Sequence, residues 1–221
     1  MISIVNILIV EDHPTMVEGY KSILNLPNSS NREFRVIAAS NCEAAFNIIR
    51  TALQPFEIVI LDMILPSFEK EKLYSGEDLA ILVQKQWPGS KIIMSTSHTE
   101  SFLLYNLIKK INPEGLLVKS DFTPEEFLNA IDCILKGQKY YSITAKQSIT
   151  EVNLDENYMD AYNRRIISLL ARGIKTKNLP QYLNISISAI DKRKAQIKDI
   201  LNIQKGNDED IIREAKKRGF V

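Results

Sequence analysis

The chain has few of the residues that build disulfide scaffolds and metal centres. Its 221 residues include two cysteines and two histidines. Cys42 and Cys133 lie far apart, and neither has a second cysteine or a histidine near it at metal-ligand spacing, so we expect two buried free thiols. His13 and His98 cannot form a metal site by themselves. These shortages exclude a disulfide-stapled fold and a structural zinc domain.

Long apolar segments are also missing. No apolar run approaches the roughly 18 residues that a membrane-spanning helix needs. Residues 1–10 are apolar, but they lack a basic leader and are followed by Glu11 and Asp12, which is not typical of a secretory signal. Hydrophobic residues make up 45% of the sequence and charged residues 25%, as in ordinary globular domains. We therefore expect a cytoplasmic globular protein with no membrane segment.

The net charge of +1 conceals an uneven distribution of charges. Residues 1–159 contain 14 Lys and Arg against 20 Asp and Glu, whereas residues 160–221 contain 14 against 7. Such a split favours two domains with different partners, the basic one suited to a polyanion. A basic surface that contacts only water is the simpler alternative. Motifs in the two parts must decide between these alternatives.

Apolar strand-like runs alternate with helix-like segments in the acidic part. The predicted strands are Ser3–Val10, Phe34–Ala39, Ile58–Leu61, Lys91–Met94 and Gly115–Val118. Helices are predicted between and after them, and Ser40 to Glu43 and Thr123 to Glu126 have capping-box patterns at two helix starts. Strict alternation of buried strands and helices predicts a parallel sheet with helices on both faces.

Polar side chains follow four of the five predicted strands. Glu11 and Asp12 follow the first strand, Asp62 the third, Thr96 the fourth and Lys119 the fifth. Ligands of open α/β sheets bind at the carboxyl ends of the strands, so we expect these side chains to meet at one edge. For Asp62 alone the simpler alternative is that it starts a turn.

Carboxylates that converge at one edge repel one another unless a cation lies between them, and oxygen ligands favour Mg²⁺. With Mg²⁺ bound, Asp62 can attack phosphorus as a nucleophile and form an aspartyl phosphate. Lys119 and Thr96 are suited to hold the phosphoryl oxygens, one as a point charge and the other as a hydroxyl donor. The strand ends therefore predict phosphoryl chemistry.

Residues 4 to about 137 resemble a response-regulator receiver domain of two-component systems. The motif positions are Glu11-Asp12, Asp62-Met63-Ile64-Leu65-Pro66, Ser95-Thr96 and Leu116-Leu117-Val118-Lys119. His13-Pro14 resembles the version found in the NarL-like subgroup. The resemblance implies a flavodoxin-like (βα)5 domain with a five-stranded parallel sheet, phosphorylated by a sensor histidine kinase or phosphotransfer protein.

The resemblance also assigns roles to single residues. It implies that Asp62 is the phosphoacceptor and that Thr96 and Lys119 bind the phosphoryl group. It implies a Mg²⁺ site made by the carboxylates of Glu11, Asp12 and Asp62 and the main-chain carbonyl of Ile64.

Two departures from the receiver pattern stand out. The family usually has Tyr or Phe three residues before the lysine, where this chain has Leu116, so a readout by a rotating aromatic ring is not expected. The turn from Pro66 to Gly76 is about six residues longer than in the family. A tolerated surface insertion is the simpler explanation. The alternative hypothesis is that residues 68–74 shape access for the phosphodonor, and unchanged phosphotransfer after their deletion would reject it.

The basic part has the pattern of a small helical domain. Residues 142–158 are polar without a clear period, and we interpret them, 149–157 in particular, as a linker between domains at 1–141 and 159–221. Asp160 is predicted to cap a first helix that ends at Gly173 and whose apolar face is Tyr162, Ile166, Leu169 and Leu170. Three further helices are predicted at 176–183, 187–201 and 208–218.

The second and third of these helices form a helix-turn-helix pattern. Helical spacing places Ile190, Ile197 and Leu201 on the core face. The residues that then face outward and are expected to meet base edges are Ser188, Asp191, Lys192, Ala195 and Gln196. The cations expected at DNA phosphates are Lys175, Lys177, Arg193 and Lys194.

This part of the chain resembles the LuxR-type effector domain. The resemblance runs from Ala171-Arg172-Gly173 through Leu183-Asn184-Ile185-Ser186 and Ala189-Ile190 to Ala215 and Gly219-Phe220-Val221. It implies an all-α, four-helix domain that binds double-stranded DNA, with a homodimer as the active form. Pro180 and Asp191 depart from the family pattern, and an acid at 191 indicates an unusual base preference.

The sequence thus predicts a response regulator in which phosphorylation of Asp62 changes DNA binding and transcription. One alternative, suggested by Leu116, is a regulator that binds DNA or protein independently of phosphorylation. A second is an Asp-nucleophile phosphatase. That enzyme would need a carboxylate two residues after the nucleophile, where this chain has Ile64.

Overall fold

The computed structural model describes residues 3–26, 32–121, 123–154, 159 and 161–221. The chain divides into two compact units, residues 1–98 with 107–146 and residues 99–106 with 147–221. The domain boundaries expected from the sequence remain predictions. The predicted cap Asp160 and residues 155–158 of the predicted linker lie outside the described residues. None of the described helices is long and apolar enough to cross a membrane.

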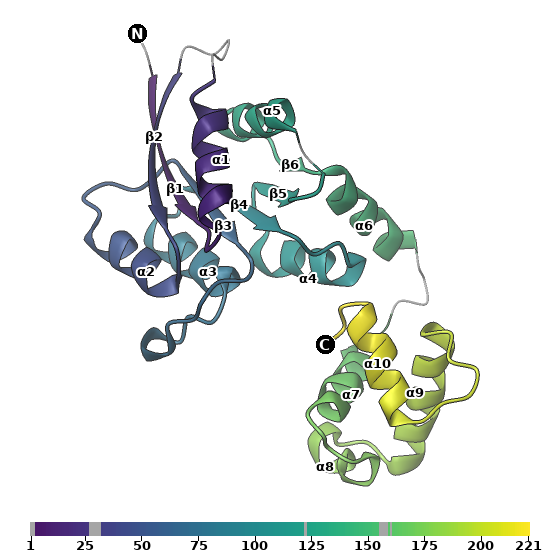
Figure 1. The fold of residues 1–221 in the computed structure, drawn as a ribbon. Coiled ribbons are helices and arrows are strands. Elements are labelled where there is room, and N and C mark those ends of the chain that lie inside the picture. Colours follow the sequence, from purple (N-terminus) through teal and green to yellow (C-terminus); the bar gives the residue numbers. More distant parts are fainter. Residues whose placement is uncertain (1–2, 27–31, 122, 155–158, 160) are drawn as a thin grey trace. The chain divides into compact units, whose positions relative to one another are not determined.

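Six parallel strands form the sheet of the first unit (Figure 1). They are β1 (Ser3–Val10), β2 (Arg32–Ala39), β3 (Ile58–Asp62), β4 (Lys91–Thr96), β5 (Gly115–Val118) and β6 (Tyr140–Tyr141). Their order, β2-β1-β3-β4-β5-β6, contains the flavodoxin-like order over the five predicted strands. The prediction of five strands missed β6, because a two-residue strand has no detectable period.

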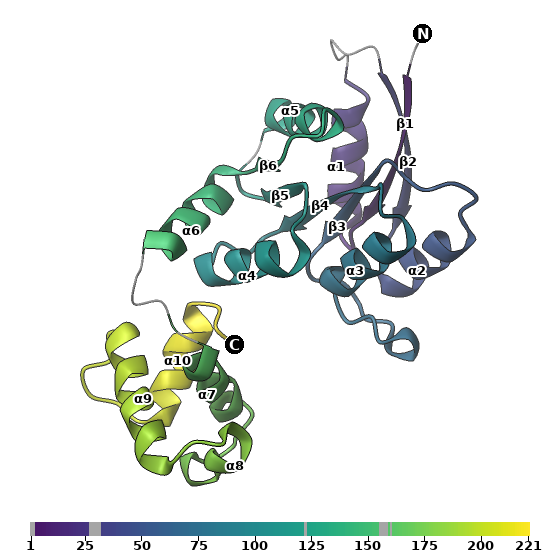
Figure 2. The same ribbon diagram turned by 180° about the vertical axis from the view of Figure 1, so that it is seen from behind.

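Helices cover both faces of this sheet. The helices of this unit are α1 (Pro14–Leu24), α2 (Cys42–Thr51), α3 (Gly76–Gln86) and α5 (Pro124–Leu135), and α4 (Ser101–Ile111) includes residues of both units. Helices α1 and α5 lie against one face, and α2 and α3 against the other (Figures 1 and 2). Thr123 and Glu126 form the predicted capping box of α5. Helix α2 is capped by Asn41, whose side chain accepts a hydrogen bond from the Ala44 N–H, so the prediction of Ser40 was wrong.

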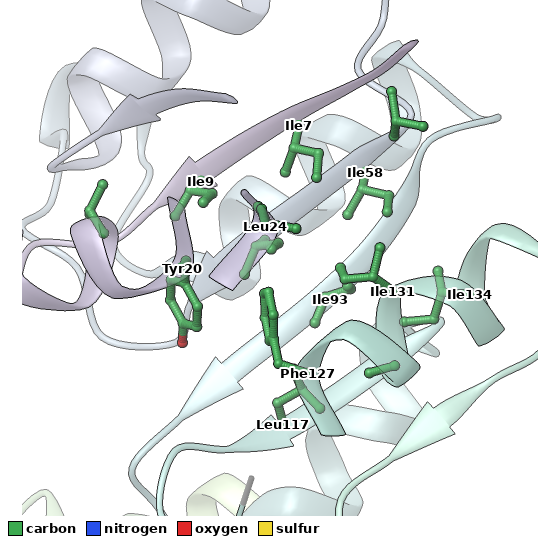
Figure 3. Close-up of a cluster of buried hydrophobic side chains, with 14 residues drawn as sticks. Ile7, Ile9, Tyr20, Leu24, Ile58, Ile93, Leu117, Phe127, Ile131 and Ile134 are labelled. Carbon is green, nitrogen blue, oxygen red and sulfur yellow. The ribbon is translucent and has the colours of Figure 1, made fainter. Parts of the chain in front are cut away.

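The core between the sheet and the α1–α5 pair is made of large apolar side chains (Figure 3). The strands contribute Ile7, Ile9, Ile58, Ile93 and Leu117, and the helices contribute Tyr20, Leu24, Phe127, Ile131 and Ile134. The rings of Tyr20 and Phe127 stack with their centroids 5.0 Å apart. Close packing of this kind transmits small displacements, so the strand ends are held in a fixed relation to both helices.

A helix that the sequence did not predict begins inside the segment expected to be a linker. It is α6 (Ile143–Leu154). Its start is tied to the end of β5, because Asp121 accepts hydrogen bonds of 2.8 Å from both the N–H and the hydroxyl of Thr144. The hydroxyl of Ser142 accepts another from the Val118 N–H at 3.2 Å. The local sequence has only weak helical periodicity. Hydrogen bonds with residues distant in the sequence therefore stabilise the start of α6.

We expect Asp121→Ala to lower the free energy of unfolding of the first unit by about 1 kcal/mol at pH 7, as loss of a helix cap does. Burial alone would raise the pKa of Asp121, but hydrogen bonds from Ser142 and Thr144 hold it below its ordinary value. The stabilisation is therefore present above the unfolded-state pKa of about 3.9. It is lost as the pH falls through the lower folded-state pKa.

Urea unfolding followed by Trp87 fluorescence measures this effect, since Trp87 is the single tryptophan and is buried in the first unit. The exposed Glu69 supplies the control variant Glu69→Ala, which should match the native protein. A difference between Asp121→Ala and the native protein that persists undiminished in acid would contradict the prediction.

The described part of the second unit is helical. From residue 159 on, its elements are α7 (Ala161–Ala171), the 3-10 turn η2 (Thr176–Asn178), α8 (Pro180–Leu183), α9 (Ile187–Ile200) and α10 (Asp208–Lys217). The helix predicted at 176–183 is thus divided in two, with Pro180 in the first turn of α8, where its missing N–H removes no helical hydrogen bond. Asn184 ends α8 with a left-handed backbone, φ 52°.

The core of this unit follows the predicted helical faces with one exception. Ile166, Leu169 and Leu170 of α7 are buried, and so are the core residues expected on α9. Tyr162 is 47% exposed, so its assignment to the apolar face was wrong. Helical periodicity alone did not separate an amphipathic tyrosine from a core residue.

Candidate functional site

The strand ends bring an acid pair, an aspartate and a lysine together at one edge of the sheet. Glu11 follows β1 and is buried, Asp62 is the last residue of β3 and is 6% exposed, and Lys119 follows β5. The Lys119 Nζ lies 2.9 Å from Asp62 Oδ2 and 2.7 Å from Glu11 Oε2. The predicted convergence of these three side chains is confirmed.

Backbone hydrogen bonds fix the two sides of this cluster to β4. The Met63 N–H, next to Asp62, donates to the Ser95 carbonyl at 3.0 Å, and the Lys119 N–H donates to the Thr96 carbonyl at 2.7 Å. The turn after Asp62 packs against the start of α3. A Cβ at Gly76 would lie 1.9 Å from the Asp62 carbonyl oxygen, so this close approach requires glycine.

Burial and the neighbouring charges shift the pKa values of Asp62 and Lys119. Burial and the negative charge of Glu11 raise the pKa of Asp62, and the hydrogen bond from Lys119 offsets only part of this rise. Burial works against the charged form of Lys119, but its bonds to Glu11 and Asp62 raise the pKa of the ammonium above its ordinary value. Lys119 therefore remains a cation beside a carboxylate whose charge is unfavourable, and a further cation would relieve that charge.

Glu11, Asp12, His13 and Asp62 can each offer one ligand atom, and these atoms lie within 4.8 Å of one another. Among the described residues, the buried oxygens Glu11 Oε2 and Asp12 Oδ1 have only the ion pairs with Lys119 and His13 as polar contacts. Such a set of carboxylate oxygens suits Mg²⁺. The N–H of Ile64 donates to Asp62 Oδ1 at 3.4 Å, and the role of its carbonyl as a ligand stays a prediction.

His13 is a member of this cluster that the sequence analysis missed. Its Nδ1 lies 2.9 Å from Glu11 Oε1 and 2.8 Å from Asp12 Oδ1. The hydrogen bond to Glu11 and the charge of Asp12 raise the pKa of the imidazole. The sequence feature that could have revealed His13 is its position directly after Glu11 and Asp12. A search for metal-ligand spacing between histidines and cysteines does not detect that feature.

Thr96 and Leu116 occupy buried positions in β4 and β5. The Thr96 hydroxyl accepts a hydrogen bond from the His98 N–H at 3.0 Å. Leu116 pairs in register with Met94 on one side and with Tyr141 of β6 on the other. The roles of Thr96 at the phosphoryl group and of Leu116 in a switch stay predictions.

The insertion after Pro66 is folded. Phe68 and Leu73 form two backbone hydrogen bonds across it, of 2.6 and 3.2 Å, around the 3-10 turn η1 (Glu69–Glu71). The Phe68 ring lies 5.7 Å from the ring of Phe46 in α2. The segment is therefore attached to α2, and its influence on access to Asp62 stays a prediction.

In the second unit, α9 presents the residues predicted to face outward to solvent. Ser188, Asp191, Lys192, Ala195 and Gln196 are all exposed, as are Lys175 and Lys177. The Ser186 side chain caps the helix by accepting from the Ala189 N–H. Exposure on one helix agrees with the predicted contacts to base edges and phosphates, which themselves stay predictions.

Arg193 and Lys194 are engaged inside the unit. Lys194 Nζ lies 2.5 Å from Asp208 Oδ1 and 2.8 Å from Thr176 Oγ1. The Arg193 guanidinium lies over the Tyr162 ring, 4.8 Å from its centroid, and one of its N–H groups donates to Asn163 Oδ1 at 3.0 Å. These two cations join α9 to its neighbours, a structural role that the sequence analysis did not foresee.

Comparison with known proteins gives a family for the first unit. Residues 7–132 match the sequence family described as "Response regulator receiver domain". This segment is more than half of the chain and contains every residue of the cluster around Asp62. The match accounts for most of the sheet, though not for β6, and for the positions of the acid pair, the aspartate and the lysine.

Similarity to individual proteins extends over nearly the whole chain. The "Oxygen regulatory protein NreC" of Staphylococcus epidermidis is 22% identical, covering 90% of this chain and 91% of that protein. The "Response regulator UvrY" of Escherichia coli is 23% identical, covering 90% and 88%. A structure of RcsB from Salmonella enterica serovar Typhimurium, bound to promoter P1flhDC, shares the fold with a TM-score of 0.69 at 18% identity, covering 95% and 97%.

Proposed function

Because the chain belongs to the response regulator receiver family, we propose that it is a two-component response regulator that accepts a phosphoryl group on Asp62 and thereby changes DNA binding by its helical unit. The observation that carries this proposal is the cluster in which Lys119 contacts both Asp62 and Glu11 at the strand ends. A sensor histidine kinase or a phosphotransfer protein is the expected donor. The protein is expected to turn over no separate substrate, and its location is expected to be the cytoplasm.

In the proposed reaction an Asp62 carboxylate oxygen forms a bond to phosphorus while the bond from phosphorus to the donor breaks. Lys119 and Thr96 bind the phosphoryl oxygens, the first through its ammonium group and the second through its hydroxyl. The carboxylates of Glu11, Asp12 and Asp62 and the carbonyl of Ile64 would hold Mg²⁺. The bound ion would offset the negative charge that these residues share with the phosphoryl group.

The proposed output is DNA binding by α8 and α9. Ser188, Asp191, Lys192 and Gln196 on α9 would meet base edges, and Lys177 would contact phosphates together with Arg193 and Lys194. The similarity to regulators over both units supports this role, and so does the likeness in fold to a protein bound to a promoter. A homodimer would place two such helices on a palindromic site about one DNA turn apart.

The test compares DNA binding by three samples: the native protein, the native protein treated with acetyl phosphate and Mg²⁺, and Asp62→Asn treated in the same way. The probe is a genomic DNA fragment selected by the treated native protein. We expect treatment to change the affinity of the native protein by a factor of about 5 to 150, as coupling between two sites does. The Asp62→Asn variant should not respond.

Identical affinities in all three samples would reject the phosphorylation switch. The salt dependence of binding tests the DNA contacts themselves, because an affinity that rests on Lys and Arg contacts to phosphates falls steeply as salt is added. An affinity independent of salt would reject the assignment of the basic unit to DNA.

A further inference from the structure

A hydrogen bond between two hydroxyl groups lies inside the core below the Asp62 cluster. The Tyr20 hydroxyl, from α1, is 2.9 Å from the Ser95 hydroxyl on β4. Tyr20 is 2% exposed and Ser95 is fully buried. A buried hydroxyl that loses its partner destabilises a protein, because it has also lost its hydrogen bonds to water. The bond between these residues therefore holds α1 and the end of β4 together.

Ser95 stands directly opposite the phosphoacceptor in the sheet. It pairs in register with Asp62 across β3 and β4, and its carbonyl accepts the hydrogen bond of the Met63 N–H. The carbonyl of the next residue, Thr96, accepts that of the Lys119 N–H. The last two residues of β4 thus hold the backbone on both sides of the ion pair between Asp62 and Lys119.

Packing in the core holds the Tyr20 ring in place. Its ring stacks on Phe127 of α5, with an angle of 24° between the ring planes, and Figure 3 shows both rings within the core. Burial raises the pKa of Tyr20, so its hydroxyl stays protonated at neutral pH and can donate a hydrogen bond to Ser95 or accept one from it. Helix α1 begins two residues after Asp12, so the same helix joins the acid pair to β4.

We propose that Tyr20 is a positioning residue for phosphoryl transfer to Asp62. Its hydroxyl fixes Ser95, and the backbone of β4 passes this constraint to Asp62 and Lys119. Tyr20 does not touch the phosphoryl group. The proposal rests on the proposed function, since it concerns the rate of the same reaction.

Tyr20→Phe is the sharpest variant, because it removes one oxygen atom and keeps the stacked ring. We expect the maximal rate of phosphorylation by acetyl phosphate to fall about 10-fold, less than the roughly 100-fold loss that a displacement of 1 Å can cause. The acetyl phosphate concentration at half-maximal rate should stay unchanged, because Tyr20 does not contact the donor. Intact-protein mass spectrometry at saturating Mg²⁺ measures both quantities.

Two further variants separate positioning from stability. Ile131→Val shortens a side chain of the same core and lowers stability through the small cavity that it leaves, and it should phosphorylate at the native rate. Ser95→Ala should be as slow as Tyr20→Phe. The double variant should be no slower than either single one, since both remove the same bond.

Each outcome bears on one of the two proposals. A native rate for Tyr20→Phe overturns the positioning role, and so does an equal slowing by Ile131→Val. In both cases the native protein still takes up the phosphoryl group, so the proposed function stands. A native protein that takes up no phosphoryl group with Mg²⁺ present overturns the proposed function instead.

Discussion

An Asp62→Asn variant will take up no phosphoryl group from acetyl phosphate, whereas the native protein will take up one per chain. The amide has nearly the shape of the carboxylate but lacks the charged oxygen that attacks phosphorus. It is also a weaker ligand for Mg²⁺, which prefers carboxylate oxygens. Intact-protein mass spectrometry with Mg²⁺ and with a chelator in its place measures the loss, and the native protein should also remain unmodified in the chelator.

We expect Asp62→Asn to lose phosphoryl uptake while it remains folded. The pKa of Asp62 is raised above its ordinary value, so ionisation of this carboxyl destabilises the folded protein relative to the unfolded chain. A neutral side chain removes the repulsion from Glu11 and weakens the bond from Lys119, two changes of opposite sign. We therefore expect the free energy of unfolding of Asp62→Asn to lie within about 1 kcal/mol of the native value. Phosphoryl uptake by a folded Asp62→Asn would assign the acceptor to another residue.

The sequence was sufficient for the strands that carry this site. The apolar run Ile58–Leu61 is buried on both faces of the sheet, and such a run predicts a central parallel strand without help from distant residues. The carboxyl ends of parallel strands share one edge, so the prediction of a cluster needed only the residues that follow each run. For that reason the meeting of Glu11, Asp62 and Lys119 could be predicted without coordinates.

Features that depend on partners far away in the sequence were missed. Helix α6 begins where Asp121 and Val118 supply hydrogen bonds from the end of β5, and its own residues have no clear period. The contacts of the Lys194 ammonium group with Asp208 and Thr176 were not predicted either, and its expected contact with DNA phosphates stays a prediction. Helical spacing predicts on which face of a helix a charged side chain lies. It does not predict the partner of that side chain when the partner belongs to another element.

Phe127 contributes strongly to the stability of the core that supports the site. This side chain of α5 is fully buried and stacks on Tyr20. We expect Phe127→Ala to lower the free energy of unfolding of the first unit by about 3–5 kcal/mol, through lost burial and the cavity left behind. This is a large share of the 5–15 kcal/mol that stabilises a typical domain. Urea unfolding followed by the fluorescence of Trp87 measures it.

The neighbouring residue on the same helix supplies the control for this prediction. Leu128 is only partly buried, so Leu128→Ala loses less apolar contact and should destabilise the unit by less than Phe127→Ala. Leu128→Ala also leaves in place the ring that stacks on Tyr20, whereas Phe127→Ala removes it. Equal destabilisation by Phe127→Ala and Leu128→Ala would show that the stacked pair is not the centre of this core.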